Sequence, residues 1–473
     1  MSTVDETDPC RITAWGLGRL IRARKLSPVE IADAVLAWID RLNPGLNALV
    51  TLYPERVRIA AQASEKAVMT GEALGLLHGV PVSIKDNFWT RDIRTTFGSK
   101  LMASFVPGED APSVARLQRA GAINIGKSNT PEFAWRGSTD NPLFGATVNP
   151  WDMSRTAGGS SGGASAAVAA GLGPLALSGD GAGSTRIPAS FCGVVGLKPT
   201  RGRIAIHPAP GAVELLLHAG PIARTVRDTA LMLTAMAGPD RRDPLSLPLE
   251  GEDFVHDLDA GIKGMRVAWS PNLGFLPVES ETRDIAEQAA RAFDDLGVRV
   301  GEADLTIADP GWILDALFGG SAAGNHSQRP DAEKAQMDPD LVAYAEALGR
   351  LTISDYVKAV QARQAIVRQL TAFFDRYDLL LTPTVGLPAF PTGMVGPTEV
   401  AGTRITHLGW SATYIFNWSG QPAISVPAGW TRDGLPVGLQ IIGRRLDDAL
   451  VLRAAAAFEA ARPWSHRWPP FEG

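Results

Sequence analysis

The chain has 473 residues, of which 45% are hydrophobic and only 20% are charged, so it has enough apolar material for a large buried core. Its 50 Asp and Glu residues outnumber its 45 Lys and Arg residues, giving a net charge of −5. This balance argues against nucleic acid as the main partner, because phosphate binding needs a basic surface. Two cysteines, Cys10 and Cys192, are too few for a disulfide framework or a metal cluster, and we predict no metal site.

The N-terminal residues are acidic and lack the basic-then-apolar order of a signal peptide. Residues 156–179 carry no charge and are numerous enough to cross a bilayer, but they are mostly Gly, Ser and Ala. Such a composition is more typical of a close-packed buried element. We therefore expect a cytoplasmic protein without membrane contact.

The first predicted element is a helix that begins at a capping box starting with Ser27 and that is stopped by Asn-Pro-Gly at 43–45. A second amphipathic helix is predicted over 55–70. We interpret residues 1–72 as an N-terminal helical cap that packs on a catalytic core formed by residues 73–473.

Short apolar runs then alternate with helical patterns. Strands are predicted at 80–84, 122–125, 265–269, 298–300, 379–381, 423–426 and 437–442, and helices at 113–120 and 281–296. This alternation indicates an α/β fold around a mostly parallel sheet.

Two Gly/Ser-rich segments, 158–163 and 179–188, are the most informative part of the chain. Ser160 and Ser184 lie 24 residues apart, which leaves room for an Ala-rich helix and a short strand. Glycine allows positive φ and a close approach of the backbone to a ligand. A developing oxyanion could therefore be held by the N–H groups of Gly181, Ala182, Gly183 and Ser184.

A lysine, Lys85, ends the apolar strand predicted at 80–84. Burial there would disfavour the charged ammonium and lower the pKa of Lys85, so that it can act as a base near neutral pH. A base, a relay hydroxyl and a nucleophilic hydroxyl would activate a serine without any histidine.

The two Gly/Ser-rich segments, continued to Arg203, closely resemble the amidase signature family. This stretch includes the tail 192–200, and the segments 79–86, 126–132 and 417–427 outside it resemble the family too. The resemblance extends over essentially the whole chain after its N-terminal segment, which makes it far more specific than one Gly-rich loop.

The resemblance implies a Ser–cisSer–Lys triad, in which Ser184 is the nucleophile, Ser160 follows a cis peptide bond, and Lys85 is the base. It further implies supporting positions around the triad, namely Ser161, Asp180 and Arg186. A single large α/β domain is implied, with a mixed, mostly parallel sheet covered by helices on both faces and without a cofactor.

This chain departs from the family pattern just before the nucleophile. Many members have two glycines where it has Ala182 and Gly183. We expect the methyl group of Ala182 to narrow the pocket near the oxyanion hole while the N–H donors remain.

A competing interpretation comes from residues 159–163, which match the G-x-S-x-G pattern of α/β-hydrolases. It would make Ser161 the nucleophile and would require a later Asp and His. This interpretation leaves Ser184 and Lys85 without roles, and we favour the triad.

Aromatic residues are the sequence's hint about the substrate. We predict that Trp135, Phe144, Trp410 and Tyr414 line the pocket, although core packing explains such residues equally well. Other aromatic residues in segments that border the site are Trp89, Trp312, Phe318 and Phe416. If several line the pocket, an aryl group in the substrate would be favoured.

The predicted function is that of a stand-alone amidohydrolase, which cleaves a small non-peptide carboxamide or arylamide through an acyl-enzyme. The alternatives are a carbamate or ester hydrolase with the same triad, and the glutaminase subunit of a tRNA-dependent amidotransferase. That subunit usually has an acidic residue within the segment matching 408–417 and a Gln matching Ile187, and this chain has neither. The predicted partner is a small-molecule amide; the oligomeric state is open, with a homodimer as one option.

Overall fold

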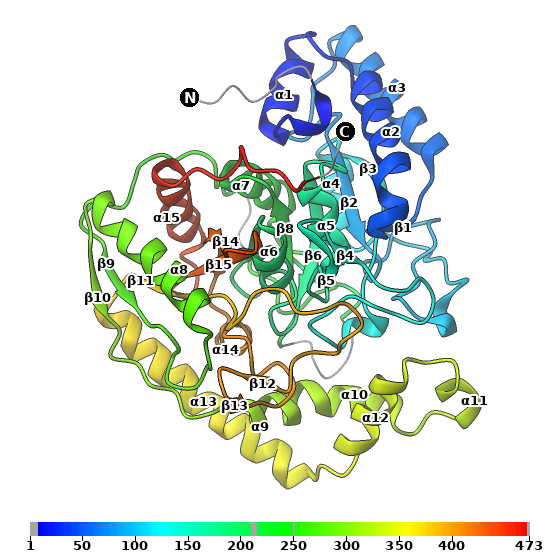
Figure 1. Cartoon of the computed structure of the whole chain (residues 1–473). Coiled ribbons are helices and arrows are strands. Elements are labelled where there is room, and N and C mark those ends of the chain that lie inside the picture. The colour runs from blue at the N-terminus through cyan, green and yellow to red at the C-terminus, as the bar shows by residue number, and fades with distance from the viewer. Residues whose placement is uncertain (1–7, 210–214, 249–250, 471–473) are drawn as a thin grey trace.

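The computed structural model describes residues 8–209, 215–248 and 251–470 (Figure 1). Its centre is an 11-stranded sheet with the order β1-β3-β2-β6-β8-β7-β14-β15-β11-β9-β10. The strands of this sheet are β1 (Leu49–Thr51), β2 (Pro81–Lys85), β3 (Ile123–Ser128), β6 (Leu175–Asp180), β7 (Val195–Lys198), β8 (His218–Ala223), β9 (Arg266–Trp269), β10 (Arg299–Glu302), β11 (Leu379–Pro383), β14 (Ala423–Trp430) and β15 (Pro436–Gly443). Two small sheets pair β4 (Val148–Asn149) with β5 (Asp152–Thr156), and β12 (Glu399–Val400) with β13 (Thr403–Arg404).

The sheet is mixed, as predicted. β2 is parallel to β3 and β6, and β9 is parallel to β10 and β11. The middle of the sheet, from β6 through β8, β7, β14 and β15 to β11, is antiparallel. Parallel pairing is thus confined to the two flanks. β14 and β15 are antiparallel because the 431–435 turn between them is far too short for the crossover that parallel strands need.

Helices cover both faces of the sheet, which confirms the predicted α/β class. They are α1 (Ala14–Arg22), α2 (Pro28–Leu46), α3 (Pro54–Thr70), α4 (Pro112–Arg119), α5 (Gly162–Ala169), α6 (Arg186–Cys192), α7 (Val226–Met236), α8 (Ser280–Arg291), α9 (Gly311–Leu314), α10 (Gly320–His326), α11 (Asp331–Lys334), α12 (Pro339–Leu348), α13 (Ile353–Arg376), α14 (Ile415–Ser419) and α15 (Asp448–Ala461). In β11, Leu379 and Leu381 join the core cluster that contains α8 and α15, whereas Leu380 joins the cluster that contains α13 and α14. This alternation is expected of a strand buried on both faces.

The capping box at the start of α2 is present, with Ser27 and Glu30 as its two side chains. The helix does not stop at 43–45, however, but continues to Leu46, and this prediction was wrong by one turn. Pro44 is tolerated inside the last turn. The Asn43 side chain accepts the N–H groups of Ala48 and Leu49 and thereby caps the chain that leaves the helix.

The N-terminal helices α1, α2 and α3 gather at one edge of the molecule (Figure 1) and share a hydrophobic cluster with the sheet. Trp38 in α2 donates its indole N–H to the Ala170 carbonyl at 2.8 Å, next to α5. These contacts tie the helices to the core, and the boundary at residue 72 stays a prediction.

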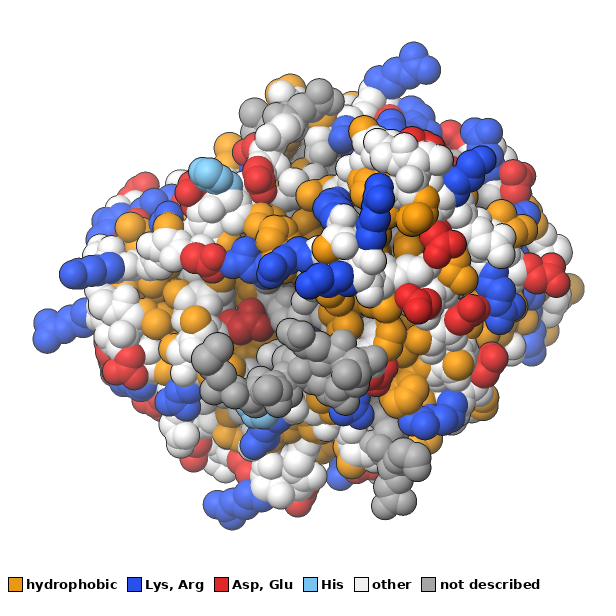
Figure 2. All heavy atoms as spheres, turned by 90° about the horizontal axis from the view of Figure 1, so that it is seen from above, with side chains coloured by type: hydrophobic (Ala, Val, Ile, Leu, Met, Phe, Trp, Pro, Cys, Tyr) orange, Lys and Arg blue, Asp and Glu red, His pale blue; other side chains and the backbone are white. Residues whose placement is uncertain are grey.

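None of the helices in the described part of the chain combines the length and the apolar character that a membrane span requires. On the face seen in Figure 2, basic and acidic side chains are interspersed. The sequence patterns predict no elements between residues 303 and 376, where the structure has α9 to α13. These helices form the lower part of the molecule in Figure 1.

Candidate active site

Lys85 is the last residue of β2 and is buried. Because β2 runs parallel to β6, the carboxyl ends of both strands lie at the same edge of the sheet. The Lys85 Nζ atom lies 2.7 Å from Ser160 Oγ and 2.9 Å from Ser161 Oγ. Two of the predicted catalytic side chains are therefore in direct contact.

Ser160 and Ser161 precede α5, and the peptide bond between Gly159 and Ser160 is cis, as the family resemblance implied. The Ser161 hydroxyl donates to the Gly179 carbonyl at 3.1 Å, so its oxygen is left to accept from Lys85. A neutral lysine has two N–H hydrogens and one lone pair. With one hydrogen directed to Ser161, the lone pair is available to the hydroxyl of Ser160.

Burial lowers the pKa of Lys85 from 10.5 to about 7, and the negative charge of Asp180 opposes this shift. A substantial fraction of Lys85 is therefore neutral near pH 7. This is the protonation state that a general base requires.

Ser184 lies between β6 and α6 and is only half-buried, so its side chain can be reached from the cavity that Lys85 and Ser160 also line. The Ser161 N–H donates to the Ser184 carbonyl at 3.1 Å, which ties the two serine loops together. Among the described residues, no hydrogen bond joins the hydroxyls of Ser160 and Ser184. The structure nevertheless brings all three predicted catalytic residues to one cavity.

The contacts of Ser161 do not support its competing assignment as an α/β-hydrolase nucleophile. Its hydroxyl is engaged by Lys85 and by the Gly179 carbonyl rather than by a histidine. This hydroxyl is therefore positioned to hold Lys85 in place.

Of the four predicted oxyanion donors, one is engaged within the protein and three are not. Gly183 has φ of 123°, and its N–H donates to Asp180 Oδ1 at 2.7 Å, so this donor is already engaged. The N–H groups of Gly181, Ala182 and Ser184 have no hydrogen-bond partner among the described residues. Of these three residues, Gly181 and Ser184 line the cavity, so their N–H groups are the ones placed near a bound substrate.

The expectation that the Ala182 methyl group narrows the pocket is wrong. Ala182 belongs to a buried apolar cluster and is not one of the described residues that line the cavity. Thr413 Oγ1 donates to the Ala182 carbonyl at 2.7 Å and holds this peptide, whose methyl group packs in the core.

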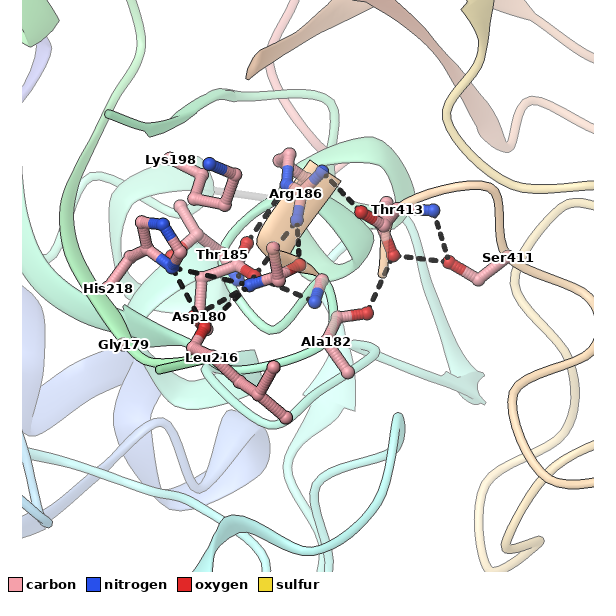
Figure 3. Close-up of polar contacts among 12 residues, drawn as sticks. Gly179, Asp180, Ala182, Thr185, Arg186, Lys198, Leu216, His218, Ser411 and Thr413 are labelled. Atoms are coloured by element: carbon pink, nitrogen blue, oxygen red, sulfur yellow. Dashed lines mark hydrogen bonds and ion pairs between the residues drawn. The ribbon is translucent and has the colours of Figure 1, made fainter. Parts of the chain in front are cut away.

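Asp180 and Arg186 form a fully buried ion pair behind the nucleophile loop (Figure 3). Arg186 Nε and Nη2 donate to the two carboxylate oxygens of Asp180 at 3.0 and 2.9 Å. Burial alone would raise the pKa of Asp180, but the Arg186 guanidinium outweighs it and holds this pKa below the usual range. The carboxylate is thus permanently charged and can accept the N–H groups of Gly183 and Thr185, which fixes the loop.

Three further residues complete this network and come from much later in the chain. Arg186 Nη1 donates to the Thr413 carbonyl and to Gln440 Oε1, and Arg186 Nη2 donates to Asn417 Oδ1. Asn417 in turn donates to Asp180. The resemblance had drawn attention to Asn417, whereas nothing in the sequence singled out Thr413 or Gln440.

The three predicted catalytic residues line a cavity of about 420 Å³. Trp135 lines it, as predicted, and so do two aromatic residues from the wider prediction, Trp89 and Phe318. The remaining aromatic side chains of the described wall are Phe88, Phe97 and Phe133. No Asp or Glu occurs among the described lining residues.

The other three pocket predictions are wrong. Trp410 is buried and stacks on Phe191, with the ring centroids 5.8 Å apart, and Tyr414 is buried against Trp418. Phe144 is half-buried beneath the Arg94 guanidinium and does not line the cavity. From the wider set, Phe416 is also in the core and Trp312 is exposed. The sequence marked these rings as near the site, but it could not show on which side of each element they point.

Among residues 8–209, 215–248 and 251–470, no group of three or more His, Cys, Asp or Glu side chains is arranged to hold a metal ion. Cys10 and Cys192 are both buried free thiols.

A serine beside a lysine-linked serine, with unengaged backbone N–H donors at the same cavity, is an arrangement suited to a serine hydrolase activated by lysine. A family model described as Amidase matches residues 30–452, and the chain belongs to this amidase family, the amidase signature enzymes. It is accordingly a hydrolase of amide C–N bonds.

The chain is similar to several proteins along its whole length. It is 43% identical to an acylamidase of Rhodococcus erythropolis over 97% of both chains. It is 37% identical to a glutamyl-tRNA(Gln) amidotransferase subunit of Moorella thermoacetica, over 97% of this chain and 98% of the relative. The solved structure of a bacterial aryl acylamidase superposes with a TM-score of 0.90 at 33% identity, covering 96% of this chain and 97% of the other.

Proposed function

We propose that this chain is a stand-alone amidase that hydrolyses small non-peptide carboxamides, with arylamides preferred. The observation that carries the proposal is the 2.7 Å contact between Lys85 and Ser160. These two residues line a cavity that Ser184 also lines and whose wall contains several aromatic side chains. The similarity to an acylamidase and to an aryl acylamidase supports it.

In the first half of the reaction, neutral Lys85 accepts the proton of Ser160, and Ser160 accepts the proton of Ser184. The Ser184 oxygen attacks the amide carbonyl carbon, and the resulting oxyanion accepts hydrogen bonds from the free N–H groups of the nucleophile loop. The proton then passes back through Ser160 to the amide nitrogen. The C–N bond breaks, the amine leaves, and an ester of Ser184 remains.

In the second half, a water molecule attacks the ester carbonyl while Lys85 and Ser160 accept its proton. The C–O bond to Ser184 breaks, the carboxylic acid leaves, and the proton returns to the Ser184 oxygen. Lys85 thus begins and ends the cycle neutral, so no group outside the triad has to change its charge.

The amidotransferase alternative is disfavoured by the cavity. Free glutamine carries an ammonium group, which calls for a carboxylate partner, and the described lining residues provide none. Trp410, in the segment where that subunit usually has an acidic residue, is core, and Ile187 is buried as well. Carbamates and esters share the acyl chemistry and stay in the test as alternatives.

The test is a rate panel on the purified full chain, with arylamides, short aliphatic amides, carbamates, esters and glutamine. Ser184→Ala should abolish turnover and labelling by a fluorophosphonate probe, whereas Ser154→Ala, at an exposed serine in β5, should change neither. A wild-type enzyme that cleaves glutamine well and arylamides poorly would refute the proposal. The cytoplasmic location and the oligomeric state, including a homodimer, stay predictions.

A further inference from the structure

His326 is the last residue of α10 and lines the active-site cavity, although the whole residue is only 6% exposed. It lies 142 residues after Ser184 in the sequence, and the catalytic cycle above gives it no task. A polar ring buried in the wall of a substrate cavity needs a hydrogen-bonding explanation.

The position of the proton on the His326 ring follows from its neighbour. Arg329 Nε lies 3.2 Å from His326 Nδ1, and a guanidinium N–H can only donate. His326 Nδ1 must therefore accept, which leaves the ring proton on Nε2. Burial, helped by the positive charge of Arg329, lowers the pKa of His326 from 6.5 to about 4, so the ring stays neutral near pH 7.

The Nε2–H group of His326 has no hydrogen-bond partner among the described residues. Among the described residues, unpartnered ring nitrogens that are fully enclosed by protein occur in His218 and His407. His326 Nε2 is not enclosed in this way. Its free donor can therefore be reached by a molecule in the cavity.

The ring of His326 is also held in a fixed orientation. It stacks on Phe133 with the centroids 4.8 Å apart and the planes 28° from parallel. Phe133 has φ of 50° and donates its N–H to the Phe97 carbonyl at 2.8 Å, so the stacking partner is itself constrained. On the other side, Glu333 pairs with Arg329 at 2.7 Å. The donor is therefore preorganised for a ligand.

We propose that His326 Nε2–H is a recognition donor that selects amide substrates bearing an uncharged oxygen acceptor, such as an ether or a carbonyl, apart from the scissile amide. Arg329 lines the cavity as well, but Glu333 already balances its charge, so the acceptor that these groups would meet is uncharged. Polar neighbours on the same helix, Ser321 and Asn325, line the cavity beside it, whereas much of the remaining described wall is aromatic. This inference rests on the proposed function and specifies its substrate class.

The test compares substrates of equal shape. The full chain is assayed with pairs of arylamides in which one member carries a methoxy group and the other an ethyl group at the same position. The pairs cover each ring position of the acyl or the amine part. We expect at least one methoxy substrate to exceed its ethyl partner in kcat/KM by about tenfold, the typical effect of one hydrogen bond. His326→Phe, which keeps the stack on Phe133 but removes the donor, should abolish this preference, so that the ratio of kcat/KM between the methoxy and the ethyl substrate falls to about one.

Two further variants control the comparison. His326→Gln should retain part of the preference, because its amide N–H₂ can replace Nε2–H. His256→Phe, at a histidine whose side chain is 78% exposed, should retain all of it. The proposal is overturned if no methoxy substrate is preferred by the wild type, or if the preference survives His326→Phe.

A binding measurement separates this proposal from the proposed function. In Ser184→Ala, calorimetry with the same pairs should show tighter binding of the methoxy substrate. When His326→Phe is added to this variant, the two substrates of a pair should bind with equal Kd. Absence of arylamide turnover in the wild type would contradict the proposed function. Normal turnover with equal binding of the pairs would contradict the role of His326 alone.

Discussion

The acid limb of the pH profile should report the titration of Lys85. Only the neutral amine can accept the proton of Ser160, and burial lowers the pKa of Lys85 to about 7. Because protonation of Lys85 removes the active form, kcat/KM should fall as the pH decreases through this value and reach a plateau above it.

The size of the effect follows from the same pKa. With a value of about 7, roughly half of Lys85 is neutral at pH 7, about one tenth at pH 6 and about one hundredth at pH 5. The logarithm of kcat/KM should therefore fall with unit slope below pH 6. Lys85→Arg should be nearly inactive at every pH, because its guanidinium stays protonated.

Lys127 offers a matched control for this experiment. It is also fully buried, in the strand next to β2, and burial lowers its pKa to about 8. Its ammonium donates to Phe88, Thr90 and Thr95 and does not contact the serines of the triad. Lys127→Met should reduce the stability, yet the folded variant should keep the acid limb.

The assay is kcat/KM for one uncharged arylamide between pH 5 and pH 9, with the folded fraction checked by circular dichroism at each pH. An acid limb that persists in Lys85→Ala, or that disappears on substitution of His207, His218 or His326, would refute the assignment of the base.

Four more predictions test the surroundings. Gly183→Ala should abolish activity and lower Tm, because its Cβ would lie 2.0 Å from Thr413 Oγ1 at φ of +123°. Gly181→Ala should fold and lose only kcat/KM, and thermal melts together with rate measurements separate the two variants. Trp135→Ala should raise KM for arylamides, whereas Trp410→Ala should mainly lower the free energy of unfolding, by about 3 kcal/mol in a denaturant titration. Chelation with EDTA should leave the rate unchanged, and a loss restored by a divalent ion would contradict the mechanism. Burial raises the pKa of Glu459 from 4.5 to about 8, so the folded chain keeps a proton that the unfolded chain loses, and stability falls as pH rises across that window. The Tm advantage of Glu459→Gln over the wild type should accordingly grow from pH 5 to pH 8.

That Lys85, Ser160 and Ser184 meet at one cavity could be predicted because each depends on local sequence. Lys85 ends an apolar strand, and Ser160 and Ser184 occur in glycine-rich loops whose backbone must pass close to other chain segments. At Gly163, a Cβ would lie 2.3 Å from the Asn129 nitrogen, so the small residue is required by packing. Such constraints leave a pattern in the chain that can be recognised without a structure.

The walls of the cavity could not be predicted in the same way. An aromatic ring in a nearby segment can face the core or the substrate, and Trp410 and Trp135 show the two outcomes. The partners of Arg186 posed a different difficulty, because Thr413 and Gln440 lie 227 and 254 residues away and only the folded sheet brings them near. Long-range contacts of this kind follow from topology, which the local pattern does not contain.

On these proposals, the residues that set reactivity and the residues that set selectivity come from different parts of the chain. The pKa of Lys85 depends on burial between β2, β6 and α5 and on Asp180, all within the first half of the chain. The recognition donor on α10 comes from a later segment that reaches the cavity through ring contacts such as that of His326 with Phe133. A substitution at His326 can therefore change which amides are accepted without altering the protonation of Lys85. The two tests above should thus give independent results: His326→Phe should change substrate preference and leave the acid limb in place, and Lys85→Arg should abolish turnover for every substrate alike.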